Sequence, residues 1–144
     1  MSKLCFPGLT LLATVFLCVF SGATPKAPER QQGLNRGKYL VEEVARCWEC
    51  HSPRDASGQA DHSRWLQGGP LWFAPIHPVQ DWAYSAPSIA GLGGFTEDQT
   101  LQVLETGIGP DGRPMRPPMH SYHLSREDAA AIVAYLKSLP AAAH

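Results

Sequence analysis

The sequence predicts an all-α protein in which three short helices are joined by long loops. Apolar residues recur at helical spacing in three segments, 36–46, 97–106 and 126–138. No run of alternating apolar and polar residues suggests a substantial sheet between them. The 144 residues include 13 glycines and 13 prolines, which are too many for a plain helical bundle. These turn-forming residues gather between the three segments, so long Gly/Pro-rich connections are expected.

The first 23 residues have the pattern of a secretory signal peptide. A positive start at Lys3 precedes an apolar run from Leu9 to Phe20, and the small residues Ser21-Gly22-Ala23 follow it. This run of 12 residues is well short of the ~20 that a spanning helix needs. We therefore expect residues 1–23 to be removed on export, in bacteria to the periplasm, with an uncleaved anchor as the alternative.

The remaining chain divides into three expected parts. Residues 24–33 are expected to form a disordered linker, residues 34–140 one domain, and residues 141–144 a flexible tail. Twelve Lys and Arg nearly balance 13 Asp and Glu, so the formal net charge is −1. This balance argues against binding of nucleic acid, which needs a basic face. No strong membrane association is expected once the signal is cleaved.

The first helix is expected to begin at Asn35 as N-cap and to run directly into Cys47. Its apolar stripe consists of Leu40, Val41, Val44 and Ala45. The second and third helices begin with capping-box patterns, in Thr96–Gln99 and Ser125–Asp128. Gly107 and Pro140 are natural stops for these two helices.

The two cysteines that follow the signal segment lie in the pentapeptide 47–51, CWECH. C-x-x-C-H is the attachment signature for c-type haem. Two thiols at this spacing lie on one face and reach the two vinyl groups of one porphyrin. The adjacent His51 can then supply Nε2 as the proximal iron ligand. The sequence therefore predicts one haem c, attached covalently through Cys47 and Cys50.

Other chemistries for this cysteine pair fit less well. A structural zinc site usually needs four ligands, and no second C-x-x-C pair exists in the chain. A thioredoxin-like pair should open a helix after a strand, whereas this motif closes a helical pattern. A haem-free binding module with a Cys47–Cys50 disulfide is the remaining alternative.

A sixth iron ligand would have to come from elsewhere in the sequence. Met115 and Met119 lie in a proline-rich loop between the second and third helices. A thioether is a soft, neutral ligand that favours Fe(II), and prolines stiffen the loop that holds it. Pro117-Pro118 immediately precede Met119. His120 is a further alternative, although each histidine taken singly is more often a surface residue.

The chain resembles the class I monohaem c-type cytochromes over roughly residues 35–140. It is most similar to the cytochrome subunits of periplasmic alcohol and aldehyde dehydrogenases. Four segments carry the resemblance: the helix entering Cys47–His51, Ala86–Thr96, Thr106–Gly112 with Pro118-Met119, and Leu124–Leu136.

This resemblance implies a cytochrome c-like fold wrapped around one covalent haem. It places the sixth ligand at Met119 and an ordinary apolar residue at Met115. His120 stands where the family commonly has proline, which keeps it as an alternative ligand. The resemblance also implies a proline carbonyl that orients His51. Pro70 is the candidate for this role, with Pro53 as the alternative.

The family packs its first and last helices crosswise, through a small residue and an aromatic one. Gly37 and Tyr135 match these positions, with Tyr39 as a further contact.

The central segment 54–86 is rich in aromatic residues, which in a bare sequence would form a core or a docking patch. Around a haem they would wall the porphyrin, and an indole N–H could reach a propionate. Trp72 and Tyr84 are therefore candidate haem contacts. Arg54 and Arg64 are candidates for pairing with propionates.

The predicted function is one-electron transfer by a periplasmic carrier rather than catalysis. With both axial positions filled, no site remains for substrate chemistry. The expected partners are redox proteins, with a dehydrogenase as donor and a cytochrome or oxidase as acceptor. A haem-based sensor or a small peroxidase-like enzyme with an open sixth site is the alternative.

Overall fold

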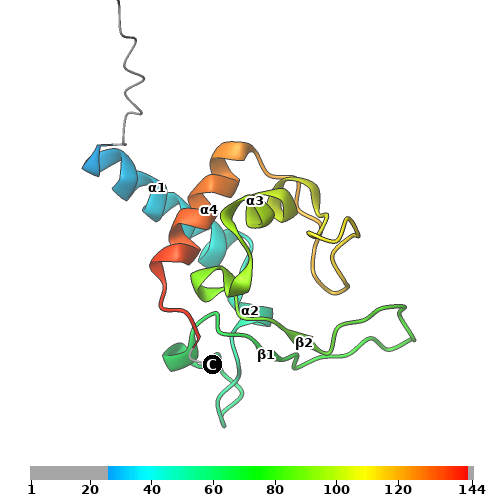
Figure 1. Ribbon diagram of the computed structural model, residues 1–144. Helices are drawn as coiled ribbons and strands as arrows, with labels where there is room; N and C mark the ends of the chain where they lie inside the picture. The colour runs from blue at the N-terminus through cyan, green and yellow to red at the C-terminus, as the bar shows by residue number, and fades with distance from the viewer. Residues whose placement is uncertain (1–25, 143–144) are drawn as a thin grey trace, which may run out of the picture.

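The computed structural model describes residues 26–142, so the expected signal peptide lies outside the described residues. The order of elements is α1 (Ala27–Tyr39), a π-helical turn (Leu40–Val44), α2 (Trp48–His51), a 3-10 turn (His62–Arg64), β1 (Gly69–Pro70), β2 (Ser85–Ala86), a 3-10 segment (Ala90–Gly94), α3 (Glu97–Thr106) and α4 (Arg126–Ser138). The fold is mainly helical with long loops, as predicted, and β1 and β2 add a small antiparallel pair (Figure 1). Within residues 26–142, no helix is both long and apolar enough to cross a membrane.

Helices α3 and α4 have the predicted bounds, and their caps explain why. The Thr96 hydroxyl accepts a hydrogen bond from the Gln99 amide at 3.2 Å, and the Gln99 side chain accepts one from the Thr96 amide at 2.9 Å. Gly107 then ends α3 in the left-handed region, with φ of 71°. At the start of α4, the Ser125 hydroxyl accepts a hydrogen bond from the Asp128 amide at 3.1 Å.

Helix α1 begins at Ala27, well before the predicted N-cap at Asn35. The expected linker is therefore wrong for residues 27–33, which are helical. A proline costs little in the first helical turn, and the Glu29 carboxylate accepts a hydrogen bond from the Lys26 amide at 3.2 Å. Farther along, Arg36 pairs with Asp128 of α4 at 2.9 Å, which ties the helix to the domain. The charged, proline-containing segment 27–33 therefore has the local composition of a linker, but it is helical in the folded protein.

The first helix does not run unbroken into the cysteine motif. It widens into a π-helical turn, in which the Ala45 amide donates to the Leu40 carbonyl at 2.8 Å. The chain then breaks at Arg46, whose φ is 49°, and α2 starts at Trp48. The Trp48 indole N–H donates to the Glu42 carbonyl at 3.0 Å within the widened turn. The motif therefore opens a short helix of its own, contrary to the expectation that it closes the first one.

Helices α1 and α4 cross at Gly37, as the resemblance implied. A Cβ placed on Gly37 would lie 2.0 Å from the Ala131 carbonyl oxygen and 2.8 Å from the Tyr135 Cβ. Only a residue without a side chain lets the two backbones come this close. Tyr39, expected as a further contact, is 53% exposed.

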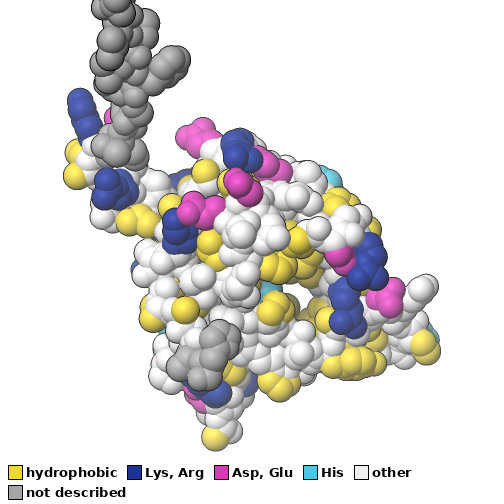
Figure 2. All heavy atoms as spheres, in the orientation of Figure 1, with side chains coloured by type: hydrophobic (Ala, Val, Ile, Leu, Met, Phe, Trp, Pro, Cys, Tyr) yellow, Lys and Arg dark blue, Asp and Glu magenta, His cyan; other side chains and the backbone are white. Residues whose placement is uncertain are grey.

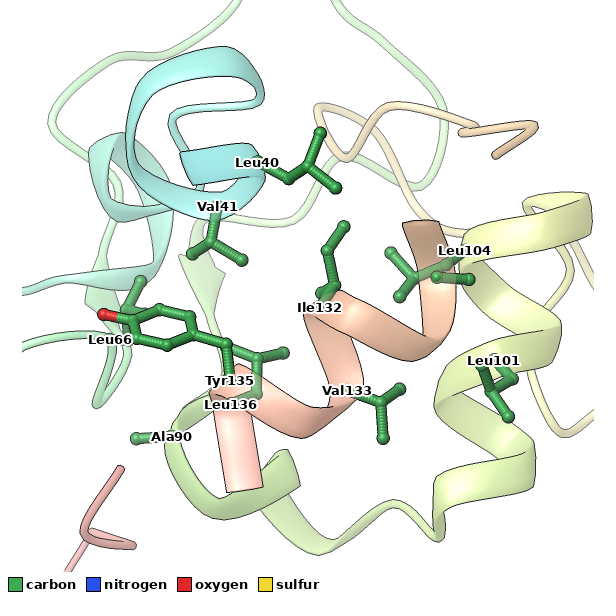
Figure 3. Close-up of a cluster of buried hydrophobic side chains, with 11 residues drawn as sticks. Leu40, Val41, Leu66, Ala90, Leu101, Leu104, Ile132, Val133, Tyr135 and Leu136 are labelled. Atoms are coloured by element: carbon green, nitrogen blue, oxygen red, sulfur yellow. The ribbon is translucent and has the colours of Figure 1, made fainter. Parts of the chain in front are cut away.

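The core lies between the π-helical turn, α3 and α4. Figure 3 shows Leu40 and Val41 facing Ile132, with Leu104 of α3 beside them. Leu66 joins this cluster from the central loop and is fully buried. The loop segment that follows the cysteine motif is therefore anchored in the core.

Replacing Gly37 with alanine should destabilise the protein by about 3 kcal/mol, since overpacking typically costs about 1–3 kcal/mol and here the added methyl meets rigid backbone. Equilibrium unfolding in denaturant measures the change. Gly33→Ala is the matched control on the same helix, because a Cβ there meets nothing within 4 Å. It should stabilise the helix by about 0.5–1 kcal/mol. Equal stability of the two variants would contradict the crossing at Gly37.

Candidate functional site

The two cysteines of the motif lie at the start and within the single turn of α2. The His51 amide donates to the Cys47 carbonyl at 2.9 Å, and the Cys50 amide to the same carbonyl at 3.3 Å. Both thiols are free and half-buried, so the Cys47–Cys50 disulfide of the alternative interpretation is not formed. The local turn thus presents two unpaired sulfurs and one imidazole from five consecutive residues.

The acidity of these thiols argues against a redox pair of the thioredoxin type. Burial raises the pKa of Cys47 to about 11. Burial and the neighbouring Glu49 carboxylate raise the pKa of Cys50 as well. A thiol–disulfide catalyst needs a lowered pKa so that the thiolate forms near neutral pH. The raised pKa values are thus unlike those of such a catalyst, and the two thiols lie together on the single turn of α2.

His51 is buried, with 7% of its surface exposed, and its ring is oriented by the backbone. Its Nδ1–H donates to the Pro87 carbonyl at 2.9 Å, which leaves the Nε2 lone pair free to bind a metal. Burial lowers the pKa of His51, and the bond to Pro87 offsets part of this effect. The imidazole is therefore held neutral, in the tautomer that an axial iron ligand requires.

The orienting carbonyl corrects one prediction. It belongs to Pro87, not to Pro70 or the alternative Pro53. The register of the two strands explains the difference, because Gly69 pairs with Ala86 and Pro70 with Ser85. Pro70 is thus held in β1 with its side chain exposed, while the residue that follows β2 presents its carbonyl to His51.

The methionine loop runs between α3 and α4. Met115 and Met119 are both half-buried, and His120 is exposed. The Met115 amide donates to the Gly107 carbonyl at 3.0 Å, which fixes this residue close to the end of α3. The Met119 amide donates to the Arg116 carbonyl at 3.0 Å and closes a tight turn. The tight turn gives Met119 a fixed place in the loop. Its assignment as the sixth iron ligand stays a prediction.

An opening lies in the middle of the molecule. Figure 2 shows it on this face, with hydrophobic side chains around it and a histidine side chain at its edge. In the same orientation, Figure 1 shows α2 and the β1–β2 hairpin on one side and the loop between α3 and α4 on the other. An opening framed by these elements, with hydrophobic side chains among those at its rim, suits a flat porphyrin.

The aromatic residues of the central segment differ in how their polar atoms are used. The Trp72 indole N–H donates to the Glu49 carbonyl at 3.2 Å, and this ring is 63% exposed. Tyr84 is 68% exposed. Within residues 26–142, the buried side-chain nitrogens that lack a partner are Trp82 Nε1 and Arg54 Nε.

These unpartnered donors are what a bound anionic group would satisfy, since buried polar atoms are rarely left unpaired. They therefore fit the two propionates of a haem. The haem contacts expected from the sequence for Trp72 and Tyr84 stay predictions. Arg64, the other propionate candidate, instead pairs with Asp61 at 2.8 Å.

Ser52 is a buried residue of the site that sequence reasoning missed. Its hydroxyl accepts a hydrogen bond from the Leu66 amide at 2.9 Å. The Gly68 amide donates to the His51 carbonyl at 2.7 Å. Together these bonds fix the backbone of the motif against the loop that anchors Leu66. The residue directly after a C-x-x-C-H motif carries no signal of this role in the sequence alone.

Comparison with known proteins agrees with this site. Residues 34–140 match the family model described as Cytochrome c. The chain is 37% identical over 116 residues to the fructose dehydrogenase cytochrome subunit of Gluconobacter japonicus, covering 76% of this chain and 22% of that protein. It is 38% identical over 126 residues to a diheme cytochrome c-type of Cereibacter sphaeroides, covering 80% and 37%.

A third relative is the cytochrome c subunit of the alcohol dehydrogenase (quinone) of Gluconobacter oxydans. It is 33% identical over 118 residues, which cover 74% of this chain and 24% of that protein. The chain thus spans between 22% and 37% of the length of these relatives. A family model that covers 34–140, together with free Cys47 and Cys50 beside an oriented His51, shows that this chain belongs to the cytochrome c family.

Proposed function

We propose that this chain is a one-electron carrier with a single haem c, attached through Cys47 and Cys50 and ligated by His51 and Met119. The observation that carries the proposal is the buried His51, whose Nδ1–H is held by the Pro87 carbonyl beside two free thiols. The bound haem would supply the chemistry, a reversible Fe(III)/Fe(II) change by one electron. One C-x-x-C-H motif in the sequence supports one haem per chain.

The residues of the chain would hold and tune the group rather than react. The two thioethers would fix its edge over α2, and the Pro87 carbonyl would keep Nε2 of His51 directed at the iron. The Trp82 indole N–H and the Arg54 Nε–H, both buried without a partner, could donate hydrogen bonds to propionates, while the other two nitrogens of the Arg54 guanidinium already donate to the Gly58 and Glu49 carbonyls. A Met119 thioether in the sixth position would favour the reduced state and leave no open site for a substrate. This arrangement supports electron transfer rather than catalysis.

The partners of this carrier are inferred from its relatives. Two of those relatives are named as cytochrome subunits of fructose and alcohol dehydrogenases. We infer that a dehydrogenase donates electrons to this chain and that a respiratory cytochrome or oxidase accepts them. The signal-like segment 1–23 supports a periplasmic location.

The proposal predicts one covalently bound haem per chain when the protein is made with the c-type maturation machinery. The haem concentration from a pyridine haemochrome assay, divided by the protein concentration, should give a ratio of one. The intact mass of the chain should exceed that of the apoprotein by the mass of one haem. A redox titration should then follow a single one-electron step and reverse without hysteresis. A chain that matures without covalent haem, or that takes up two, would contradict the proposal.

A further inference from the structure

One hairpin connects the two sides of the site. We define the strap as residues 69–87, which run from β1 through a long loop to β2 and Pro87 (Figure 1). Its base is closed by the β1–β2 pair and by the Leu71 amide, which donates to the Tyr84 carbonyl at 3.0 Å. On the attachment side, the strap contributes the Pro87 carbonyl that holds His51 at 2.9 Å. The strap is therefore fixed to the proximal side of the site.

The other end of the strap is fixed to the methionine loop. Arg116 donates from Nε to the Asp81 carbonyl at 3.0 Å and from Nη2 to the Trp82 carbonyl at 3.1 Å. The Ala83 amide donates to the Pro117 carbonyl at 2.7 Å. Within residues 26–142, these three bonds are the hydrogen bonds by which the turn 116–119 is joined to other segments.

The guanidinium of Arg116 suits this task. Its planar fork can donate to two acceptors at once, and here it spans two consecutive carbonyls of the strap. Arg116 lies three residues before Met119, and the Met119 amide donates to its carbonyl at 3.0 Å. The same residue thus closes the turn with its backbone and ties the turn to the strap with its side chain.

We propose that Arg116 is a positioning residue for the sixth ligand, because its side chain ties the turn that carries Met119 to the strap. This inference rests on the proposed ligation by Met119. The Met119 thioether could leave the iron when its loop opens, and an external ligand could then take its place. Each bond between the turn and the strap makes that opening less frequent. Arg116 touches no reacting atom in this scheme and acts only through the position of Met119.

The test is a titration of the ferric holoprotein with imidazole. Binding of imidazole is monitored by the loss of the weak absorption band that arises from charge transfer between the methionine sulfur and the iron. We expect Arg116→Ala to bind imidazole about tenfold more tightly than the wild type, as the loss of two charge-assisted hydrogen bonds at an exposed site suggests. Arg116→Lys keeps one charged donor and should fall between the two.

Arg113→Ala is the matched control. Arg113 lies on the same loop, but among residues 26–142 its side chain pairs only with Asp111, two residues away, at 2.7 Å. Its removal should leave imidazole affinity unchanged. Far-UV circular dichroism of all variants should remain that of the wild type, because both arginines are exposed.

A reciprocal measurement separates positioning from a merely structural role. The Ala83 amide donates to the Pro117 carbonyl in the turn that carries Met119. If the strap holds this turn in place, displacement of the thioether by imidazole should speed hydrogen exchange at the Ala83 amide. The Leu71 amide at the base of the strap should stay protected and serves as the internal reference. Hydrogen exchange at the Ala83 amide that is unchanged by imidazole would overturn the proposed link between the turn and the strap.

The possible failures can be told apart. Equal imidazole affinity of Arg116→Ala and Arg113→Ala, with the sulfur band present in the wild type, would overturn the role of Arg116 and leave the proposed function standing. Absence of the sulfur band in the wild-type ferric protein would contradict the ligation by Met119, and this inference would then fail with it.

Discussion

The Met119→Ala variant is expected to lose the weak sulfur-to-iron band of the ferric protein and to show a lower reduction potential. A thioether stabilises Fe(II), so its removal shifts the couple toward Fe(III). The fall should be on the order of 0.1 V or more, within the ~0.8 V over which axial ligands set haem potentials. Near-infrared absorption and a spectroelectrochemical titration measure the two effects on the same sample.

Met115→Leu is the matched control for this variant. Met115 is half-buried and its amide is fixed to the Gly107 carbonyl, so leucine can replace it with little change in volume. The sulfur band should survive. Loss of the band in Met115→Leu and not in Met119→Ala would reverse the assignment. A wild-type ferric protein that is high-spin, and that binds CO at once when reduced, would instead favour the sensor or peroxidase-like function.

Where the sequence predicted structure well, the information was local. The bounds of α3 and α4 follow from caps that involve residues three apart, Thr96 with Gln99 and Ser125 with Asp128. The C-x-x-C-H motif is likewise a contiguous signal, and it predicted the cysteines and the histidine that the structure brings together. Such signals are readable because both partners of each bond are close in the chain.

Where the sequence misled, the deciding contact was distant. Helix α1 extends back to Ala27 and is tied to α4 by Arg36 and Asp128, residues 92 positions apart. The carbonyl that holds His51 comes from Pro87, 36 positions away, and depends on the register of β1 and β2. Neither contact leaves a mark in the local pattern, so Pro70, chosen on the resemblance to the family alone, was the wrong choice.

The central segment shows a third kind of difficulty. Leu66 belongs to the core, yet it is one apolar residue in a loop of polar and aromatic neighbours, with φ of 59°. Trp82 is the indole left without a partner, whereas Trp72 was the candidate haem contact. Composition alone cannot rank aromatic residues in a long loop. Their roles depend on which N–H groups the folded backbone satisfies.

Replacing both cysteines, Cys47→Ser with Cys50→Ser, is expected to abolish covalent haem and to destabilise the domain strongly. Cys47 is packed against the core cluster, and hydrophobic side chains lie at the rim of the opening beside α2. If the haem covers roughly 200 Å² of that surface, its loss removes about 5 kcal/mol of stability at ~25 cal/mol per Å². Acid–acetone extraction followed by a pyridine haemochrome assay measures attachment, and thermal unfolding measures stability.

The single variants make this experiment decisive. Cys47→Ser and Cys50→Ser each keep one thioether, so each should retain haem through extraction, with the shifted α-band of a single saturated vinyl group. Their stability should lie between that of the wild type and that of the double variant. Haem that resists extraction in the double variant would mean that attachment does not depend on this motif. Because His51 remains in all three variants, any such difference belongs to the thioethers and not to the proximal ligand.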